Sequence, residues 1–331
     1  MIRVIVDDFK EYVDFLSLTD TEYVDVFLDK GIAYFVCSTP ELFGMLTLRA
    51  VIDTEEEINY SFRVPRNTMI KLGTQGVLLI SVDTDIVNID VTGSQANVLW
   101  SFSFRRQGVY TSEYIDKIKL CSTLKNYTTF SMQSIYPIVR YARPFNAIIT
   151  VNKGLATAFI DSRVRLCKRV KLQDNISISS NVLNKLLKFS FNVCHVRNYL
   201  AAASQRVVLL ATLCMPADFP EFEILEEQKS AMKCKLSLAN IFDLFNKMDF
   251  KTDTVSLDFN SKLMLLEKNR VTYKVPLSIQ EMQCSPAYKP EILTLNLRIV
   301  KNLLSKISSE YRLEKRQTCL RLQCEDLIIY L

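Results

Sequence analysis

The feature that most constrains the fold of this chain is a recurring order of elements: a strand, a short helix and then further strands. Hydrophobic residues alternate in the strand segments and recur every three or four positions in the helical segments. The cycle occurs about six times, at a spacing of roughly fifty residues, and repeats of this length are typical of arrays and rings. The residues themselves do not repeat, so an α+β protein without internal repeats remains the alternative.

Six segments have a helical period. The clearest is Ser180–Phe189, in which one apolar stripe lies opposite polar and basic positions. The expected helices are 8–18, 66–73, 132–143, 180–189, 237–248 and 297–307. Alternating strands fill most of the intervening sequence, so we expect an α+β fold in which antiparallel sheets carry one helix for each cycle.

The length of 331 residues predicts more than one domain. Two cycles for each domain divide the chain into 1–106, 128–217 and 218–331, and a polar, irregular connector is expected at 107–127. The third domain is expected to end one strand short of the other two.

Positive charge is concentrated in the expected helices. The chain has a formal net charge of +5, and the six helices hold eleven basic and four acidic residues. Long cations on exposed helix faces suit contacts with phosphates that do not read bases. The alternative is an ordinary solvated helix face. The candidate DNA-binding residues are Arg66, Lys71, Arg140, Arg143, Lys185, Lys188, Lys247, Arg298, Lys301 and Lys306.

Composition argues against an enzyme. Only seven glycines are present, and no phosphate-binding loop or nucleophile elbow occurs. The nine cysteines form no C-x-x-C pair, and the single histidine, His195, completes no metal-ligand spacing. His195 follows Cys194 in an expected strand, where neighbouring side chains point to opposite faces, so the two are not expected to form a nucleophile–base pair. We therefore expect no catalytic residue, no metal and no cofactor.

No apolar run is long enough to span a membrane. The first residues, MIRVIVDDFKEY, carry acids where a signal peptide needs an apolar core. These observations predict a cytoplasmic protein with reduced thiols and no membrane partner.

The stretch Met215–Leu225, with the sequence MPADFPEFEIL, separates the second and third expected domains. Pro220 fixes its own φ and biases Phe219 toward an extended conformation, which predicts an extended connector. We expect Phe219 and Phe222 to anchor it, whereas Pro220, Ile224 and Leu225 are expected to be partly exposed. An ordinary interdomain linker is the alternative.

Three segments resemble the bacterial-type sliding clamp, the DNA polymerase III beta subunit. The sequence ADFPEF at 217–222 is similar to the family pattern G-x-F-P-D-Y, without its glycine. DSRVRL at 161–166 is similar to the family turn D-G-H-R-L-A, without its Gly-His core. EILTLNLRIVKNLLSKI at 291–307 resembles the strand and helix that open the last half-domain. The order of elements is similar along the whole chain, and the drift of each motif suggests a divergent or phage-encoded member.

The resemblance implies three similar clamp domains with outer antiparallel sheets and inner helices. Two chains would form a homodimeric ring around double-stranded DNA at the replication site, and helix cations would contact DNA without regard to sequence. The ring would act as a processivity factor, and short peptides of DNA polymerase and of the clamp loader would bind it. The residues that match the family's peptide pocket are Arg163, Arg165, Leu166, Pro220, Ile224, Leu225, Ile328, Ile329, Tyr330 and Leu331. Because the family has a basic residue at the position of Ile224, a different peptide preference is expected.

Two other functions remain open. The first is a monomeric, clamp-like processivity factor that binds DNA with an open basic face. The second, from another class, is a β-rich structural or assembly protein, such as a phage particle component, whose basic helices are solvated.

Overall fold

The computed structural model describes most of the chain. The described residues are 2–6, 9–29, 31–52, 60–71, 76–92, 97–107, 109, 112–160, 164–215, 221–240, 242–243, 254–268, 271–289 and 292–331. At several positions within these ranges, among them Lys71, Glu221–Glu223 and Arg298, only the backbone is described. The chain divides into two compact units, which are Met1–Met132 with Lys185–Leu213, and Gln133–Asn184 with Cys214–Leu331.

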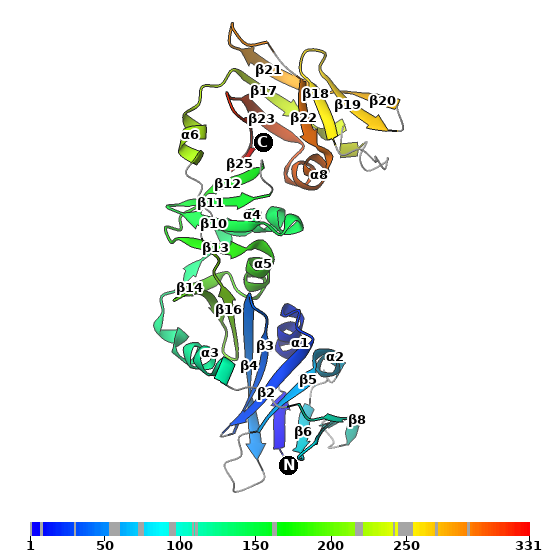
Figure 1. Ribbon diagram of the computed structural model, residues 1–331, viewed down its shortest axis with the longest axis vertical. Helices are drawn as coiled ribbons and strands as arrows, with labels where there is room; N and C mark the ends of the chain where they lie inside the picture. The colour runs from blue at the N-terminus through cyan, green and yellow to red at the C-terminus, as the bar shows by residue number, and fades with distance from the viewer. Residues whose placement is uncertain are drawn as a thin grey trace. The chain divides into compact units, whose positions relative to one another are not determined.

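The first unit is built on a twelve-stranded sheet whose described strand pairs are all antiparallel. The main path runs β8-β7-β6-β1-β4-β16-β15-β14-β9, and β2, β3 and β5 branch from it. Figure 1 shows the course of the chain. The strands are β1 (Ile2–Val6), β2 (Tyr23–Asp29), β3 (Ile32–Ser38), β4 (Leu42–Ile52), β5 (Tyr60–Pro65), β6 (Gly76–Val82), β7 (Ile86–Thr92), β8 (Val98–Arg105), β9 (Phe130–Ser131), β14 (Asn192–Val196), β15 (Tyr199–Ala203) and β16 (Val207–Thr212).

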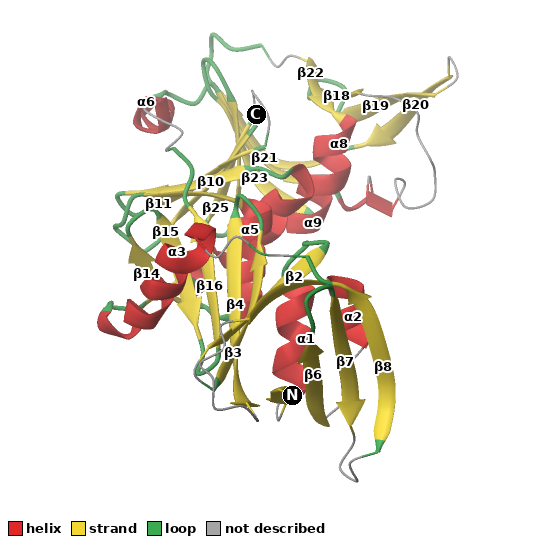
Figure 2. Cartoon of the chain, turned by 60° about the horizontal axis from the view of Figure 1, so that its bottom comes forward, coloured by secondary structure: helices red, strands yellow, loops and turns green. Residues whose placement is uncertain are grey.

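Two helices of this unit, α1 (Phe9–Leu18) and α2 (Arg66–Lys71), lie side by side against the sheet (Figures 1 and 2). The helical spacing of Tyr12, Phe15 and Leu16 turns all three side chains into the core, where each is at most 2% exposed. The ring of Tyr12 packs edge-on against Phe35 of β3, with ring centroids 6.0 Å apart.

The segment 107–127 contains a helix, contrary to the irregular connector expected there. Helix α3 (Ser112–Thr123) continues into the short 3-10 turn η1 (Leu124–Asn126). Tyr114, Cys121 and Leu124 lie on one face of it and are buried in an apolar cluster with sheet residues. The Tyr114 hydroxyl also donates to buried Asp25 at 3.0 Å. The helical period of these residues was overlooked because polar residues dominate the segment.

The second unit holds a nine-stranded sheet, β13-β10-β11-β12-β25-β24-β23-β17-β21, and a four-stranded sheet, β20-β19-β18-β22. Both are antiparallel in their described pairs. The strands are β10 (Ile148–Asn152), β11 (Leu155–Phe159), β12 (Arg165–Arg169), β13 (Ile176–Ser179), β17 (Met232–Ser237), β18 (Thr254–Asp258), β19 (Leu263–Lys268), β20 (Val271–Pro276), β21 (Ser278–Cys284), β22 (Ile292–Asn296), β23 (Glu310–Lys315), β24 (Leu320–Cys324) and β25 (Leu327–Tyr330).

Helix α4 (Tyr136–Ala142), flanked by the 3-10 turns η2 (Gln133–Ile135) and η3 (Arg143–Phe145), packs on β10, β11 and β12. A second helix follows β22 and has three parts, α8 (Leu297–Ile299), η4 (Val300–Leu304) and α9 (Ser305–Ile307). Its middle part, η4, is π-helical, because the Ser305 N–H reaches back five residues to the Val300 carbonyl. Helix α5 (Ser180–Phe189) matches its expected range, and the division between the two units falls within it.

Two expectations for the C-terminal part are wrong. The segment after the last helix is not one strand short, because Glu310–Lys315 forms β23, which pairs with both β17 and β24. The connector is not extended throughout either, because Glu221–Glu227 forms the helix α6. A proline just before a helix costs little, since its missing N–H would have no partner within the helix. Phe219 and Pro220 lie outside the described residues.

The α+β class and the antiparallel sheets are confirmed. The three domain boundaries stay predictions, since the two compact units follow a different division.

Candidate functional site

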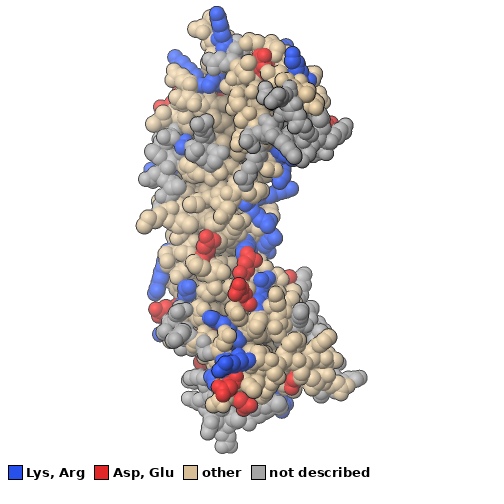
Figure 3. Space-filling model, turned by 45° about the vertical axis from the view of Figure 1, so that its right-hand side comes forward, with Lys and Arg blue, Asp and Glu red and all other residues tan. Residues whose placement is uncertain are grey.

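The candidate DNA-binding cations of the first unit differ in whether they already have a hydrogen-bond or ion-pair partner within the chain. The Arg66 Nε donates to the Leu16 carbonyl at 2.8 Å, at the C-terminal end of α1, where a positive charge is favourable. Lys185 forms an ion pair with Asp20. Lys188 is exposed. Figure 3 shows acidic side chains next to some of the basic ones. Of these three cations, Lys188 is therefore the most available to a ligand.

In the second unit, Arg140 and Arg143 are exposed at the end of α4 and in η3, and Lys301 and Lys306 are exposed on the last helix. The Arg140 guanidinium lies over the ring of its neighbour Tyr141, 5.9 Å from the centroid. Lys301 projects from the π-helical turn, while Val300, Leu303 and Leu304 of the same turn are buried. Lys247 lies outside the described residues, as do the side chains of Lys71 and Arg298.

The peptide-pocket residues converge on the seam between β12 and β25. The two strands are paired, with Arg165 opposite Tyr330 and Cys167 opposite Ile328. On the other side of β25, Leu331 extends the pairing with β24, because its N–H and carbonyl both bond to Leu320. The sheet therefore brings together segments that are more than 150 residues apart in the sequence.

An apolar cluster, which we call the α6 cluster, covers one face of this seam. It consists of the buried residues Cys167, Leu225, Cys319 and Tyr330, with partly buried Leu155 and Ile328 against it. Opposed residues of antiparallel strands share a face, so Leu166 and Ile329 point to the other face, where they are 0% and 1% exposed. Of these two neighbours, Cys167 and not the predicted Leu166 therefore faces the α6 cluster, because a shift of one residue along a strand turns the side chain to the opposite face.

The expectation that Leu225 would be partly exposed is wrong. Leu225 is 9% exposed and belongs to the α6 cluster, whereas Ile224 beside it is 60% exposed. A helix turns consecutive side chains by about 100°, so α6 presents one to the core and the other to solvent. Arg165 stacks over the Phe159 ring at 5.3 Å. Arg163 and Pro220 lie outside the described residues.

A buried ionic network fastens α6 to the sheet. The Arg321 Nε donates to Glu226 Oε1 at 3.0 Å, and the Tyr330 hydroxyl donates to the same oxygen. Arg316 donates to the Leu225 carbonyl and, at 3.0 Å, to Glu314 Oε2. Arg316 and Arg321 are only 6% and 7% exposed, so each needs its carboxylate partner.

These contacts keep both carboxylates ionised. Burial by itself would raise the pKa of Glu226, but the Tyr330 hydroxyl and the two guanidiniums outweigh it and lower that pKa. Burial would likewise raise the pKa of Glu314, but Arg316, Arg321 and Ser230 outweigh it and lower that pKa. Burial and the neighbouring Glu226 raise the pKa of Tyr330, so its hydroxyl stays a donor.

The network predicts an acid-sensitive stability. Carboxylates with lowered pKa values stabilise the folded state above their ordinary pKa of 4.5, and this contribution is lost as pH falls through the folded values. We expect the wild-type melting temperature to fall more steeply below about pH 4.5 than that of the Glu226→Gln/Glu314→Gln double variant. Thermal melts between pH 7 and pH 3 measure this, and parallel curves would contradict it.

Sequence reasoning missed Glu226, Glu314, Arg316 and Arg321. The carboxylate of Glu226 and the guanidinium of Arg321 are brought together only by the docking of α6 on β24, and no local spacing signals that contact. Cys167 was missed for a different reason, namely the register of β12.

The histidine does not form a nucleophilic site with its neighbour. Cys194 pairs with Ala201 and His195 with Leu200, so their side chains lie on opposite faces of β14. Burial raises the pKa of Cys194, which favours the thiol. Among the described residues, no group of three or more potential ligands is arranged to hold a metal ion, and no helix is long and apolar enough to cross a membrane.

The fold is similar to solved sliding clamps along the whole chain. No family model matches the sequence, and no curated protein matches it. A structure assigned as a DNA polymerase III beta subunit from Eubacterium rectale aligns with 100% of this chain and 98% of its own, with a TM-score of 0.74 at 8% identity. The beta subunit of Thermotoga maritima aligns with 100% and 98%, with a TM-score of 0.68 at 13% identity.

A third similar structure is the beta clamp of Helicobacter pylori bound to a DNA ligase peptide. It covers 100% of this chain and 99% of its own, with a TM-score of 0.66 at 8% identity. At identities this low, the likeness speaks to the fold. The chain has, over its whole length, the fold of the DNA polymerase III beta subunits, the sliding clamps.

Proposed function

We propose that this protein is a DNA sliding clamp, a processivity factor without catalysis. Two copies would close a ring around duplex DNA at the replication site in the cytoplasm, and the ring would tether the polymerase and the clamp loader through short peptides. The observation that carries the proposal is a clamp fold that covers 100% of the chain at a TM-score of 0.74.

The exposed helix cations support the DNA contact. Lys188, Lys301 and Lys306 are exposed, and among the described residues none of their ammonium groups has a hydrogen bond or ion pair. Ammonium groups on flexible stems neutralise phosphates without reading bases, which permits sliding. Because Arg66 and Lys185 already have partners within the chain, we expect smaller contributions from these two.

The α6 cluster supports the peptide contact. Ile328 of β25 is partly buried against this cluster, and Ile224 of α6 is 60% exposed; both are among the residues that match the family's pocket. A peptide with apolar side chains could complete the burial of Ile328. The Helicobacter pylori clamp with its bound ligase peptide is a precedent for this mode of recognition in a protein of the same fold.

Charge reversal tests the DNA contact. We expect Lys188→Glu/Lys301→Glu/Lys306→Glu to weaken DNA binding strongly and to reduce the slope of log affinity against log salt by about one per lost contact. The matched control reverses three exposed lysines outside the helices, Lys171, Lys274 and Lys289, and should keep the slope. Equal losses in both variants would contradict the proposal.

Topology separates the ring from its rivals. A closed ring stays on nicked circular DNA in high salt and slides off when the DNA is linearised. An open-faced monomer dissociates from both forms as salt rises, and a structural protein has no affinity that depends on DNA ends. If the protein stays on the DNA equally well before and after linearisation, it does not form a closed ring around the duplex.

A further inference from the structure

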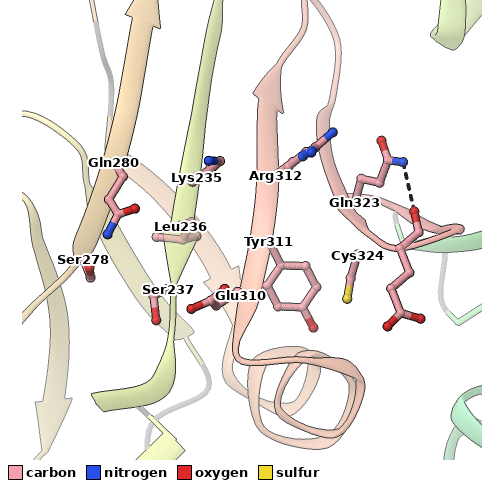
Figure 4. A pocket seen from close by; sticks show the side chains of 11 residues that line it. Lys235, Leu236, Ser237, Ser278, Gln280, Glu310, Tyr311, Arg312, Gln323 and Cys324 are labelled. Atoms are coloured by element: carbon pink, nitrogen blue, oxygen red, sulfur yellow. Dashed lines mark hydrogen bonds between the residues drawn. The ribbon is translucent and has the colours of Figure 1, made fainter.

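A polar groove lies on the same sheet face as the α6 cluster. It has a volume of about 500 Å³ and is open to solvent over β21, β17, β23 and β24. Figure 4 shows its side chains, among them Lys235 and Arg312, with Gln323 held by a hydrogen bond from its Nε2 to the Glu325 carbonyl at 3.0 Å. Nothing in the proposed clamp function so far uses this groove.

Strand register makes the groove continuous with the α6 cluster. Cys167 lies opposite Ile328, Ile328 opposite Gln323, and Gln323 opposite Arg312. Arg312 in turn lies opposite Lys235. Directly opposed residues share a face. One row of side chains therefore runs from the apolar cluster, across Gln323, to two cations.

The row is short enough for one peptide to cover. Neighbouring strands are about 4.8 Å apart, so Ile328 and Arg312 are separated by about 10 Å. A peptide in the polyproline II conformation advances about 3.1 Å per residue with three residues per turn, so side chains three positions apart lie on the same side, about 9 Å from each other. A side chain three residues beyond an apolar residue on Ile328 would thus reach Arg312.

The positive charges of Arg312 and Lys235 favour an acidic peptide side chain at the position that reaches Arg312. Arg312 is exposed and has no ion pair or hydrogen bond within the described part of the chain, and Lys235 beside it holds only the exposed Glu281. On the flanking positions of β23, Glu314 forms ion pairs with Arg316, Arg321 and Lys233, whereas Glu310 lines the groove together with Glu325. A guanidinium can hold a carboxylate with two parallel hydrogen bonds.

We propose that partner peptides continue from the α6 cluster along this row and place a carboxylate on Arg312, with Lys235 beside it. The inference rests on the proposed peptide site and adds a specificity determinant to it, namely an acidic residue three positions after the apolar one.

Fluorescence anisotropy with synthetic peptides tests the inference. The probes are labelled Leu-Phe-Gly-Ser-Asp and the same peptide ending in asparagine, both amidated so that the side chain is the only difference in charge. We expect the aspartate peptide to bind about three- to fivefold more tightly, in the upper part of the range for an exposed ion pair. Arg312→Gln should abolish the difference, while the control Lys233→Gln, an exposed lysine in the adjacent row, should keep it.

The outcomes separate this inference from the function on which it rests. Equal affinities for the two peptides, or an aspartate preference that survives Arg312→Gln, would overturn the acidic determinant and leave the peptide site standing. Failure of both peptides to bind the wild-type protein would overturn the peptide site and the inference together.

Discussion

Replacing Glu226 with alanine should destabilise the second unit by about 3 kcal/mol, near the lower end of the range for breaking a buried ion pair. The substitution leaves Arg321 and Tyr330 without their shared acceptor, while both arginines stay within reach of Glu314. The loss is expected at the lower end because the Glu226 side chain is 29% exposed. Urea unfolding and amide exchange in α6 would measure it.

The neighbouring Glu227 provides a matched control. It is exposed on the same helix, so Glu227→Ala should change stability by less than about 0.5 kcal/mol. The double variant Glu226→Gln/Arg321→Met should recover part of the stability that Glu226→Ala loses. Methionine removes the buried guanidinium at position 321, so no charge is left there without its carboxylate partner. If Glu226→Ala unfolds at the same urea concentration as Glu227→Ala, the network does not hold α6 to the sheet.

Replacing Trp100 with glutamate should dissociate the proposed homodimer. Strand β8 ends the main path of its sheet and pairs only with β7 among the described strands. Val98, Leu99 and Trp100 are 56%, 50% and 56% exposed on it. An open edge with exposed apolar side chains invites a strand from a second copy, and a central tryptophan is a typical hot spot.

We expect the dimer dissociation constant to rise at least about 100-fold, or about 3 kcal/mol, because the carboxylate would be buried without a partner. Light scattering across a concentration series measures it. Ile115→Glu introduces the same charge at a residue of α3 that is 42% exposed, and it should leave the dimer intact. A wild-type protein that is monomeric at micromolar concentration would exclude the dimer ring. Equal dissociation by both variants would remove β8 from the interface.

Much of the fold could be predicted because it depends on local periodicity. Helix α5 matches its expected range, since its apolar stripe is visible within ten residues. The α3 and α6 helices were missed because the first is polar and the second follows a proline, so each is stabilised mainly by what it packs against.

The candidate site divides along the same line. The sequence alone predicted candidate residues on particular strands and helices and indicated cations on the helices, because amphipathic period and residue type are properties of short segments. Only the tertiary structure decided that Cys167 rather than Leu166 faces α6, that Lys185 is held by Asp20, and that Arg321 meets Glu226. Strand register and the docking of α6 set these contacts, and both depend on residues far apart in the chain, where a shift of one position turns every side chain to the opposite face.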